Sequence, residues 1–202
     1  MSYGYFIPVG REQIELVIQR SRFIATATYT PSVETARAFI AEMSQTYPDA
    51  SHHVYAFAIG HGASVIHGMS DAGEPSGTAG KPTLAVVKGS GLGDVTVVTS
   101  RYFGGTKLGT GGLVKAYTEA AQLVLAKIAR LEKVDKRRLT FALPYHLYEP
   151  VRRLIAHYEG EIEAEDFAAE VTLSLVIPER QAQKFAAELA EISSGRLRLD
   201  QT

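Results

Sequence analysis

The segment RYFGGTKLGTGGLVKAY, residues 101–117, carries the residue types best suited to holding an anion. It lies between a strand-like run and a helix-like run, so its backbone N–H groups can be aimed at a phosphate without side chains in the way. Arg101, Lys107 and Lys115 would add positive charge. The glycines that would permit close approach are Gly104, Gly105, Gly109, Gly111 and Gly112. Neither the Walker nor the dinucleotide-binding glycine pattern is complete, so two interpretations stay open: a phosphate cradle, or a turn for close helix–sheet packing.

Two aromatic residues adjoin this segment. Tyr102 and Phe103 follow Arg101 directly, and an exposed ring beside a cation is a stacking surface for unpaired bases. Adjacent residues of a strand point to opposite faces, so we expect one ring to be available for stacking and the other to be in the core.

A second glycine-rich loop, SDAGEPSGTAGKP at 70–82, brings Asp71, Gly73, Glu74 and Lys81 into one polar segment. Two carboxylates can bind Mg²⁺ or act as acid and base. The simpler interpretation, which we favour, is an ordered loop in which backbone N–H groups satisfy both carboxylates. Lys81 is the residue of this loop that we expect to contact a phosphate.

Other chemistry finds little support in the composition. The chain has no cysteine, which excludes disulfides and thiolate chemistry. His52 and His53 are neighbours on a predicted strand and face opposite ways, so they cannot easily share a metal ion. We therefore expect no metal, no cofactor and no catalytic residue.

The bulk properties bound the function class. The 202 residues carry a net charge of -1, so nucleic-acid binding would need a local patch. No uncharged apolar run approaches membrane-spanning length. The N-terminus lacks the pattern of a signal peptide. We expect a cytoplasmic protein that does not enter the membrane.

The elements that must position these loops follow from periodicity. Alternating apolar residues predict two strands within 13–29, connected near 20–22, and further strands at 53–59 and 94–100. A helix is predicted to begin at Pro31 and Ser32, and a short one to cover 82–88. A continuous apolar stripe from Leu113 to Ile128 predicts a long helix with Thr110 as its N-cap.

The charged run 132–138 indicates a domain junction, giving domains at 1–132 and 137–202. The second domain reads as strand 139–143, helix 147–158, strands 162–167 and 171–177, a helix from Pro178, and a last strand with Leu197 and Leu199. That order, β-α-β-β-α-β, is the ferredoxin-like split motif. Four glutamates on alternate positions, 159 to 165, predict the solvated face of one strand.

Three segments together resemble the YigZ/IMPACT family, which includes translation-linked proteins: RSRFIA at 20–25, DAGEPSGTAGKP at 71–82, and the segment 101–117. The resemblance covers the whole chain and implies an α+β protein. Its N-terminal domain would resemble the ribosomal-protein domain-2-like β-α fold, and its C-terminal domain would be a ferredoxin-like βαββαβ sandwich. Relatives usually carry a second acidic residue where this chain has Ala72, which weakens any mechanism that needs three acids in the loop.

Two hypotheses for function remain. In the first, the protein is non-catalytic, binds RNA or the ribosome through segment 101–117 and Lys81, and affects translation. In the second, it is an enzyme that acts on a phosphorylated small molecule or nucleotide through the two glycine-rich loops, with Asp71 or Glu74 as base or Mg²⁺ ligand.

Overall fold

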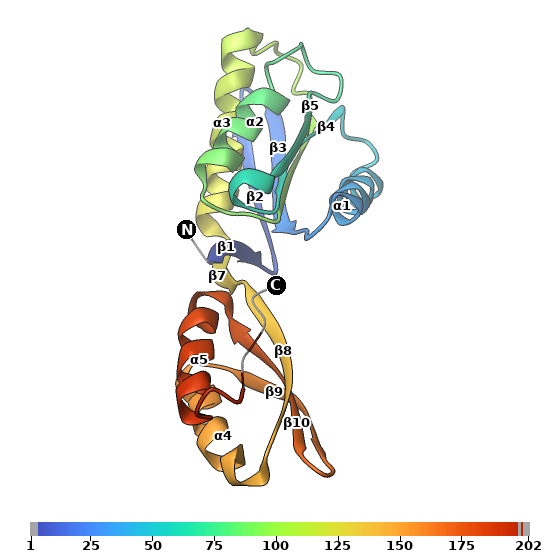
Figure 1. Ribbon diagram of the computed structural model, residues 1–202. Helices are drawn as coiled ribbons and strands as arrows, with labels where there is room; N and C mark the ends of the chain where they lie inside the picture. Colours follow the sequence, from blue (N-terminus) through green and yellow to red (C-terminus); the bar gives the residue numbers. More distant parts are fainter. Residues whose placement is uncertain (1–3, 198, 200–202) are drawn as a thin grey trace. The chain divides into compact units, whose positions relative to one another are not determined.

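A computed structural model describes residues 4–197 and residue 199 of the chain. The protein is an α+β protein of two units, each with its own hydrophobic core: Tyr5–Lys133, and the chain from Val134 onward. Figure 1 shows one sheet with helices in each unit.

The N-terminal unit is built on a five-stranded antiparallel sheet with the strand order β2-β3-β6-β4-β5. Its strands are β2 (Arg11–Ile18), β3 (Ser21–Tyr29), β4 (His52–Ile59), β5 (Ile66–Ser70) and β6 (Val95–Tyr102). Strand β6, the β-branched run predicted at 94–100, is the middle strand and is buried almost throughout. Strand β5 was not among the predicted strands.

The predicted hairpin in 13–29 is confirmed, with its turn placed slightly earlier than expected. Gln19 and Arg20 connect β2 to β3 and both have positive φ, 46° and 67°. Two such residues in succession form the tight turn that matches the twist of an antiparallel pair. Ser21, which we assigned to the connection, is the first residue of β3 and is buried.

Helices cover both faces of this sheet (Figure 1). Helix α1 (Val33–Thr46) packs on one face, and its predicted start is confirmed because Ser32 is the N-cap of a complete capping box. Helices α2 (Gly80–Gly89) and α3 (Gly109–Lys127) pack on the other face. Both helices follow the loops singled out in the sequence.

A two-stranded ribbon, β1 (Gly4–Val9) with β7 (Ala129–Val134), was not predicted. The buried Asp94 carboxylate lies between its strands and accepts hydrogen bonds from the Tyr5 hydroxyl, the Lys133 ammonium and the Gly60 N–H, each at 2.7 Å. These contacts, called here the Asp94 clamp, join the first and last strands of the unit to the middle of its sequence. A short 3-10 helix, η1 (Gly62–Ser64), follows Gly60.

The C-terminal unit has three antiparallel strands in the order β8-β10-β9, with two helices against them. Its elements are β8 (Lys136–Leu143), η2 (Tyr145–Leu147), α4 (Tyr148–His157), β9 (Glu161–Phe167), β10 (Val171–Pro178) and α5 (Glu179–Ile192). The predicted β-α-β-β-α order is confirmed.

The predicted last strand is not formed among the described residues. Leu197 and Leu199 pack against the core of the C-terminal unit, but neither belongs to a strand, and residue 198 lies outside the described residues. The apolar pattern at these positions reflects burial rather than pairing.

The acidic run is not the single solvated face that we predicted. The register of β9 against β10 shifts between Ser174 and Leu175, which is a bulge. Glu165 lies opposite the buried Leu173, on the helix side, and accepts a hydrogen bond from Tyr148. Glu163 instead pairs with Arg138. One extra residue therefore divides the run between the two faces of the sheet.

Candidate functional site

The strand register brings three side chains together beneath α3. Arg101 of β6 lies opposite Phe23 of β3 on one side and opposite His52 of β4 on the other. Directly paired residues point to the same face of a sheet. Tyr117 of α3 packs edge-to-face on Phe23, with ring centroids 5.3 Å apart. The end of β6 thus places a buried cation in the layer between sheet and helix.

Glu74, from the loop before α2, completes this layer. Its carboxylate accepts hydrogen bonds from the Arg101 guanidinium at 2.6 Å and from the Tyr117 hydroxyl at 2.7 Å. His52 Nε2 lies 3.9 Å from the second carboxylate oxygen. Glu74 and Arg101 are only 7% and 5% exposed. Burial raises the pKa of Tyr117 above its usual range, and the neighbouring Glu74 charge raises it further.

Two more contacts tie the 101–117 segment to the β2–β3 turn. The Ser21 hydroxyl accepts hydrogen bonds from the Arg101 guanidinium at 3.3 Å and from the Gly104 N–H at 3.2 Å. A Cβ on Gly104 would lie 2.0 Å from the carbonyl carbon of Arg20. Only glycine fits at this position, and the reason is close packing of two protein backbones.

Asp71 holds the start of α2. Its carboxylate accepts three backbone hydrogen bonds, from Gly77, Ala79 and Gly80, at 2.8 to 3.0 Å. Burial acts to raise the pKa of Asp71, but these three donors outweigh it and the net shift is downward. The favoured interpretation holds for Asp71, whose carboxylate already takes the place an anion would have at this helix end. It does not hold for Glu74, because side chains rather than backbone N–H groups satisfy that carboxylate.

These contacts change the roles expected for several residues. Burial of Arg101 and its ion pair with Glu74 argue against the direct phosphate contact that we predicted for it. Gly73 has φ +88° and serves the turn, where a Cβ would lie 3.3 Å from His52. The described residues contain no cluster of three or more acidic, histidine or cysteine side chains placed to hold a metal ion.

The N-terminus of α3 is different from that of α2. The helix begins at Gly109, with Leu108 as N-cap and no side-chain capping hydrogen bond. The N-cap predicted at Thr110 was therefore wrong, since that residue already lies in the first turn. Gly105 and Gly109 have positive φ, 84° and 71°, whereas Gly111 is exposed with no atom near its absent side chain. At Gly112 a Cβ would lie 3.1 Å from the Leu108 side chain.

Exposed side chains surround this helix start. Phe103 is 50% exposed, and Lys107 and Lys115 are exposed as well. Tyr102 is half-buried, with the Arg22 guanidinium 5.2 Å from its ring centre. Phe103 is thus the more exposed ring of the two, and the Arg101 guanidinium lies 5.7 Å from its ring centre.

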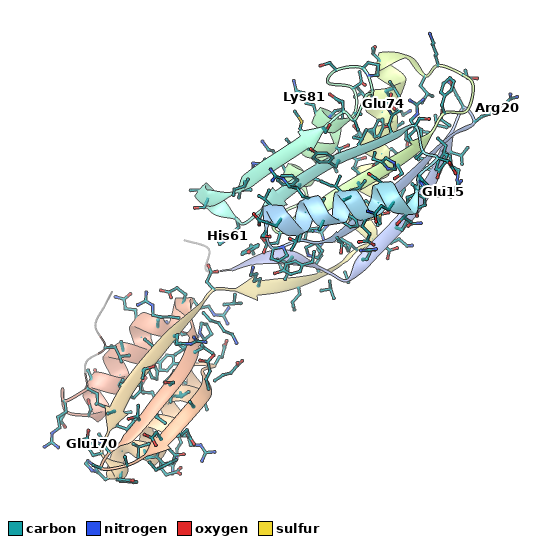
Figure 2. The ribbon with its side chains drawn as sticks, turned by 90° about the vertical axis from the view of Figure 1, so that its right-hand side faces the viewer. Glu15, Arg20, His61, Glu74, Lys81 and Glu170 are labelled. Atoms are coloured by element: carbon teal, nitrogen blue, oxygen red, sulfur yellow. The ribbon has the colours of Figure 1, made fainter. Side chains whose placement is uncertain are left out.

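Two further cations lie at the same end of the unit. Lys81 is exposed in the first turn of α2, and Arg20 is exposed in the β2–β3 turn whose backbone Gly104 touches. Figure 2 shows Lys81, Glu74 and Arg20 at one end of the N-terminal unit and His61 at the other. We did not assign Arg20 from the sequence.

Sequence reasoning also missed His52, Ser21 and Tyr117 as members of the buried layer. Tyr117 was assigned to the apolar stripe of α3, and the only signal against that assignment was its hydroxyl, which needs a partner when it is buried. The signal for Ser21 was its place in the motif RSRFIA.

The comparisons with known proteins agree over both units. Residues 19–125 match the Impact N-terminal domain, and residues 141–196 match the Domain of unknown function (DUF1949). An IMPACT family member of Haemophilus influenzae is 41% identical over 194 residues, which cover 96% of this chain and 94% of that protein. The IMPACT family member YigZ of Escherichia coli is 39% identical over 197 residues, 97% of each chain. A crystal structure described as a hypothetical protein matches with a TM-score of 0.72 and 38% identity, over 98% of this chain and 97% of that one. No helix in the described part of this chain has the length and apolar character needed to cross a membrane.

Proposed function

The chain belongs to the IMPACT family, and we propose that it is a non-catalytic cytoplasmic protein that binds RNA or the ribosome and affects translation. The observation that supports this most directly is the start of α3, which is exposed, glycine-rich and without a side-chain cap. Uncapped N–H groups at a helix start attract an anion. Asp71 fills the corresponding position at α2, so α3 is the end left for a ligand.

The side chains around this end suit an RNA backbone with unpaired bases. Lys107 and Lys115 would neutralise phosphates, and Lys81 and Arg20 extend the positive charge. Phe103 would stack on a base, since stacking on an exposed ring tolerates any sequence. We assign Arg101 a supporting role, in which its ion pair with Glu74 holds β6 and the loop that follows.

The finer fold assignment belongs to this proposal. We infer that the N-terminal unit is related to the ribosomal-protein domain-2-like fold. We infer also that the C-terminal unit is a ferredoxin-like domain with the β-α-β-β-α part of the motif in place. Fold alone does not determine chemistry. The proposal therefore depends on the α3 site, which is the exposed start of α3 together with Phe103, Lys107 and Lys115.

The alternative, an enzyme acting on a phosphorylated small molecule, has less support. It would require Asp71 to leave three backbone hydrogen bonds, or Glu74 to leave Arg101 and Tyr117. The approach of His52 to Glu74 is the observation in its favour. Turnover of a nucleotide or phosphoester that is lost in Glu74→Gln with the fold intact would support this alternative.

The test is binding to ribosomes, a single-stranded RNA and a duplex RNA over a salt series. We expect affinity to fall with salt, and the Lys107→Ala/Lys115→Ala variant to bind single strands more weakly. Its slope of log affinity against log salt should decrease by about 1.4, because each phosphate contact on a single strand contributes about 0.7.

The matched control is Lys88→Ala/Lys127→Ala, which removes the same charge from the far ends of α2 and α3. Position 127 lies 18 residues along α3 from Gly109, about 27 Å away at the helical rise. Equal weakening by both double variants would remove the α3 site from the proposal. No salt-sensitive binding to any of the three probes would contradict the proposal itself.

A further inference from the structure

A groove of about 830 Å³ runs between α2 and α3 on the outer side of the N-terminal unit. Its apolar lining is formed by Pro82, Ala85, Val86, Val114, Leu125 and Ala126. These apolar side chains belong neither to the buried Glu74 layer nor to the α3 site. Of the groove's lining only Lys81, at one end, is also assigned to RNA binding.

The groove exists because small residues face outward where the two helices meet. Ala85 and Gly89 of α2 and Ala126 of α3 are exposed and leave the space between the helix backbones unfilled. Adjacent helices normally close this space with interlocking side chains at an axial separation of 8–10 Å. Small residues at such a position allow another backbone to approach closely.

The charged residues that line the groove have one sign. Lys81 lies at the α2 start and Arg130 beyond the end of α3, and the lining contains no carboxylate. Within the described residues Lys81 makes no ion pair. Arg130 donates hydrogen bonds to the carbonyl oxygens of Ser90 and Leu125, which fix its guanidinium without neutralising it. A complementary partner would therefore be apolar along its centre and acidic at its edges.

The dimensions favour a helix as that partner. The lining extends from Val114 to Ala126 along α3, about 18 Å at 1.5 Å per residue, or roughly three helical turns. Helical walls offer no free strand edge to an extended peptide. The lining has no aromatic ring on which a base could stack. We propose that the groove docks an acidic amphipathic helix of a partner protein, with its apolar stripe against Val114 and Ala126 and its carboxylates toward Lys81 and Arg130.

The proposal shares only Lys81 with the proposed RNA site, and it is tested without knowing the partner. The full chain would be used to select from a displayed library of 16-residue helical peptides with apolar residues at i, i+3, i+4, i+7 and i+11. The remaining positions would vary among Glu, Lys, Gln and Ala. We expect enrichment of acidic sequences, and amide NMR shifts from an enriched peptide confined to α2, α3 and the residues around Arg130.

Two variants connect the binding to the groove. Ala126→Trp fills the groove from an exposed position and should weaken an enriched peptide at least tenfold. Lys81→Glu should shift selection toward basic peptides. Leu123→Trp is the matched control, because Leu123 is exposed on α3 outside the groove lining, and it should leave binding unchanged.

Failure to enrich any helical peptide, enrichment of basic peptides by the unaltered chain, or shifts away from α2 and α3 would overturn the proposal. So would single-stranded RNA that shifts the resonances of Ala126 and Arg130, at the end of the groove opposite the shared Lys81, and competes with an enriched peptide, because the whole groove would then belong to the RNA site.

Discussion

At the scale of single residues, the Glu74–Arg101 pair is the most consequential contact in the N-terminal unit. The two charges are buried together, and Tyr117 and Ser21 supply additional hydrogen bonds. The Arg101 Nε–H is nevertheless buried with no partner within the described residues. An arrangement of this kind tolerates the loss of neither charge, because the one that remains is isolated from water.

We expect Glu74→Gln to destabilise the protein strongly. The substitution keeps the size of the side chain but leaves the Arg101 charge buried without a counter-charge, which costs about 3 kcal/mol or more. Urea unfolding would measure the loss. Glu15→Gln is the control, since Glu15 pairs with Arg22 at the surface and should change stability by less than about 1 kcal/mol. Similar losses in the free energy of unfolding for the two substitutions would mean that burial does not determine how much the Glu74–Arg101 pair contributes to stability.

At the scale of elements, the N-termini of α2 and α3 differ in whether a carboxylate of the chain caps their backbone N–H groups. The α2 start is closed by the Asp71 carboxylate, and the α3 start is glycine-rich and has no side-chain cap. A helix start gains stability from an anion, whether that anion is its own side chain or a ligand. From this difference we propose that α2 is a structural support and that α3 is the element that binds a ligand.

We expect the Asp71 carboxylate to make the free energy of unfolding depend on pH. Its pKa is lowered in the folded protein, so the stabilisation is complete above the unfolded-state value near 4 and is lost as the pH falls through the lower folded value. Asp71→Asn should be about 1 kcal/mol less stable at pH 7, and the gap to the unaltered protein should narrow below about pH 4.

The control for this prediction is Ser90→Ala, which removes a side-chain hydrogen bond to the Val87 carbonyl oxygen at the other end of α2 and touches no titratable group whose pKa is shifted. Its deficit should stay constant with pH. Unfolding free energies measured from pH 7 to pH 3 compare the two variants, and a constant gap for Asp71→Asn as well would show that its carboxylate is not the titrating cap.

A substitution at Gly111 distinguishes the two interpretations of segment 101–117, a phosphate cradle or a turn for close helix–sheet packing. Apart from its chain neighbours and the backbone of its own helix, no atom lies within 4 Å of the Cβ that alanine would add, and the residue is helical. Gly111→Ala should therefore raise stability by about 0.5 kcal/mol through helix propensity. It should weaken RNA binding if the RNA backbone approaches closely there. Gly89→Ala is the control, at an equally open helical position in α2. Unchanged RNA affinity in Gly111→Ala would show that this glycine is not needed for close approach.

The sequence predicted elements that carry their own periodicity and missed those defined by a distant partner. Helix α1 has a capping box, and α3 has a continuous apolar stripe, so both could be recognised locally. Strand β5 is a short edge strand that contains a histidine and a glycine, and no alternation marks it. The burial of Arg101 depends on Glu74, 27 residues earlier in the chain, and no local pattern predicts that closure.

At the scale of the whole molecule, each unit has a separate core, so we propose that the two are independent domains. The predicted boundary at 132 is best moved past Lys133, because that side chain completes the Asp94 clamp. A fragment of residues 1–134 should unfold cooperatively and keep the salt-dependent RNA binding of the full chain. Circular dichroism and the same binding series check this. Loss of RNA binding in a folded fragment would place part of the interface in the C-terminal unit.

The β1–β7 ribbon sets an order of events during synthesis. Strand β1 leaves the ribosome before the rest of the unit, and its partner β7 and the Lys133 ammonium that reaches Asp94 follow more than a hundred residues later. Strand β1 therefore lacks its strand partner while the five-stranded sheet is synthesised behind it, at the usual elongation of about 5–20 residues per second. The bridge of Phe6 to Leu92 can form before β7 appears. Nascent chains stalled before residue 129 should expose β1 to proteases, and chains stalled well beyond residue 134 should protect it. Strand β1 therefore gains its pairing with β7 only after the rest of the N-terminal unit has been synthesised.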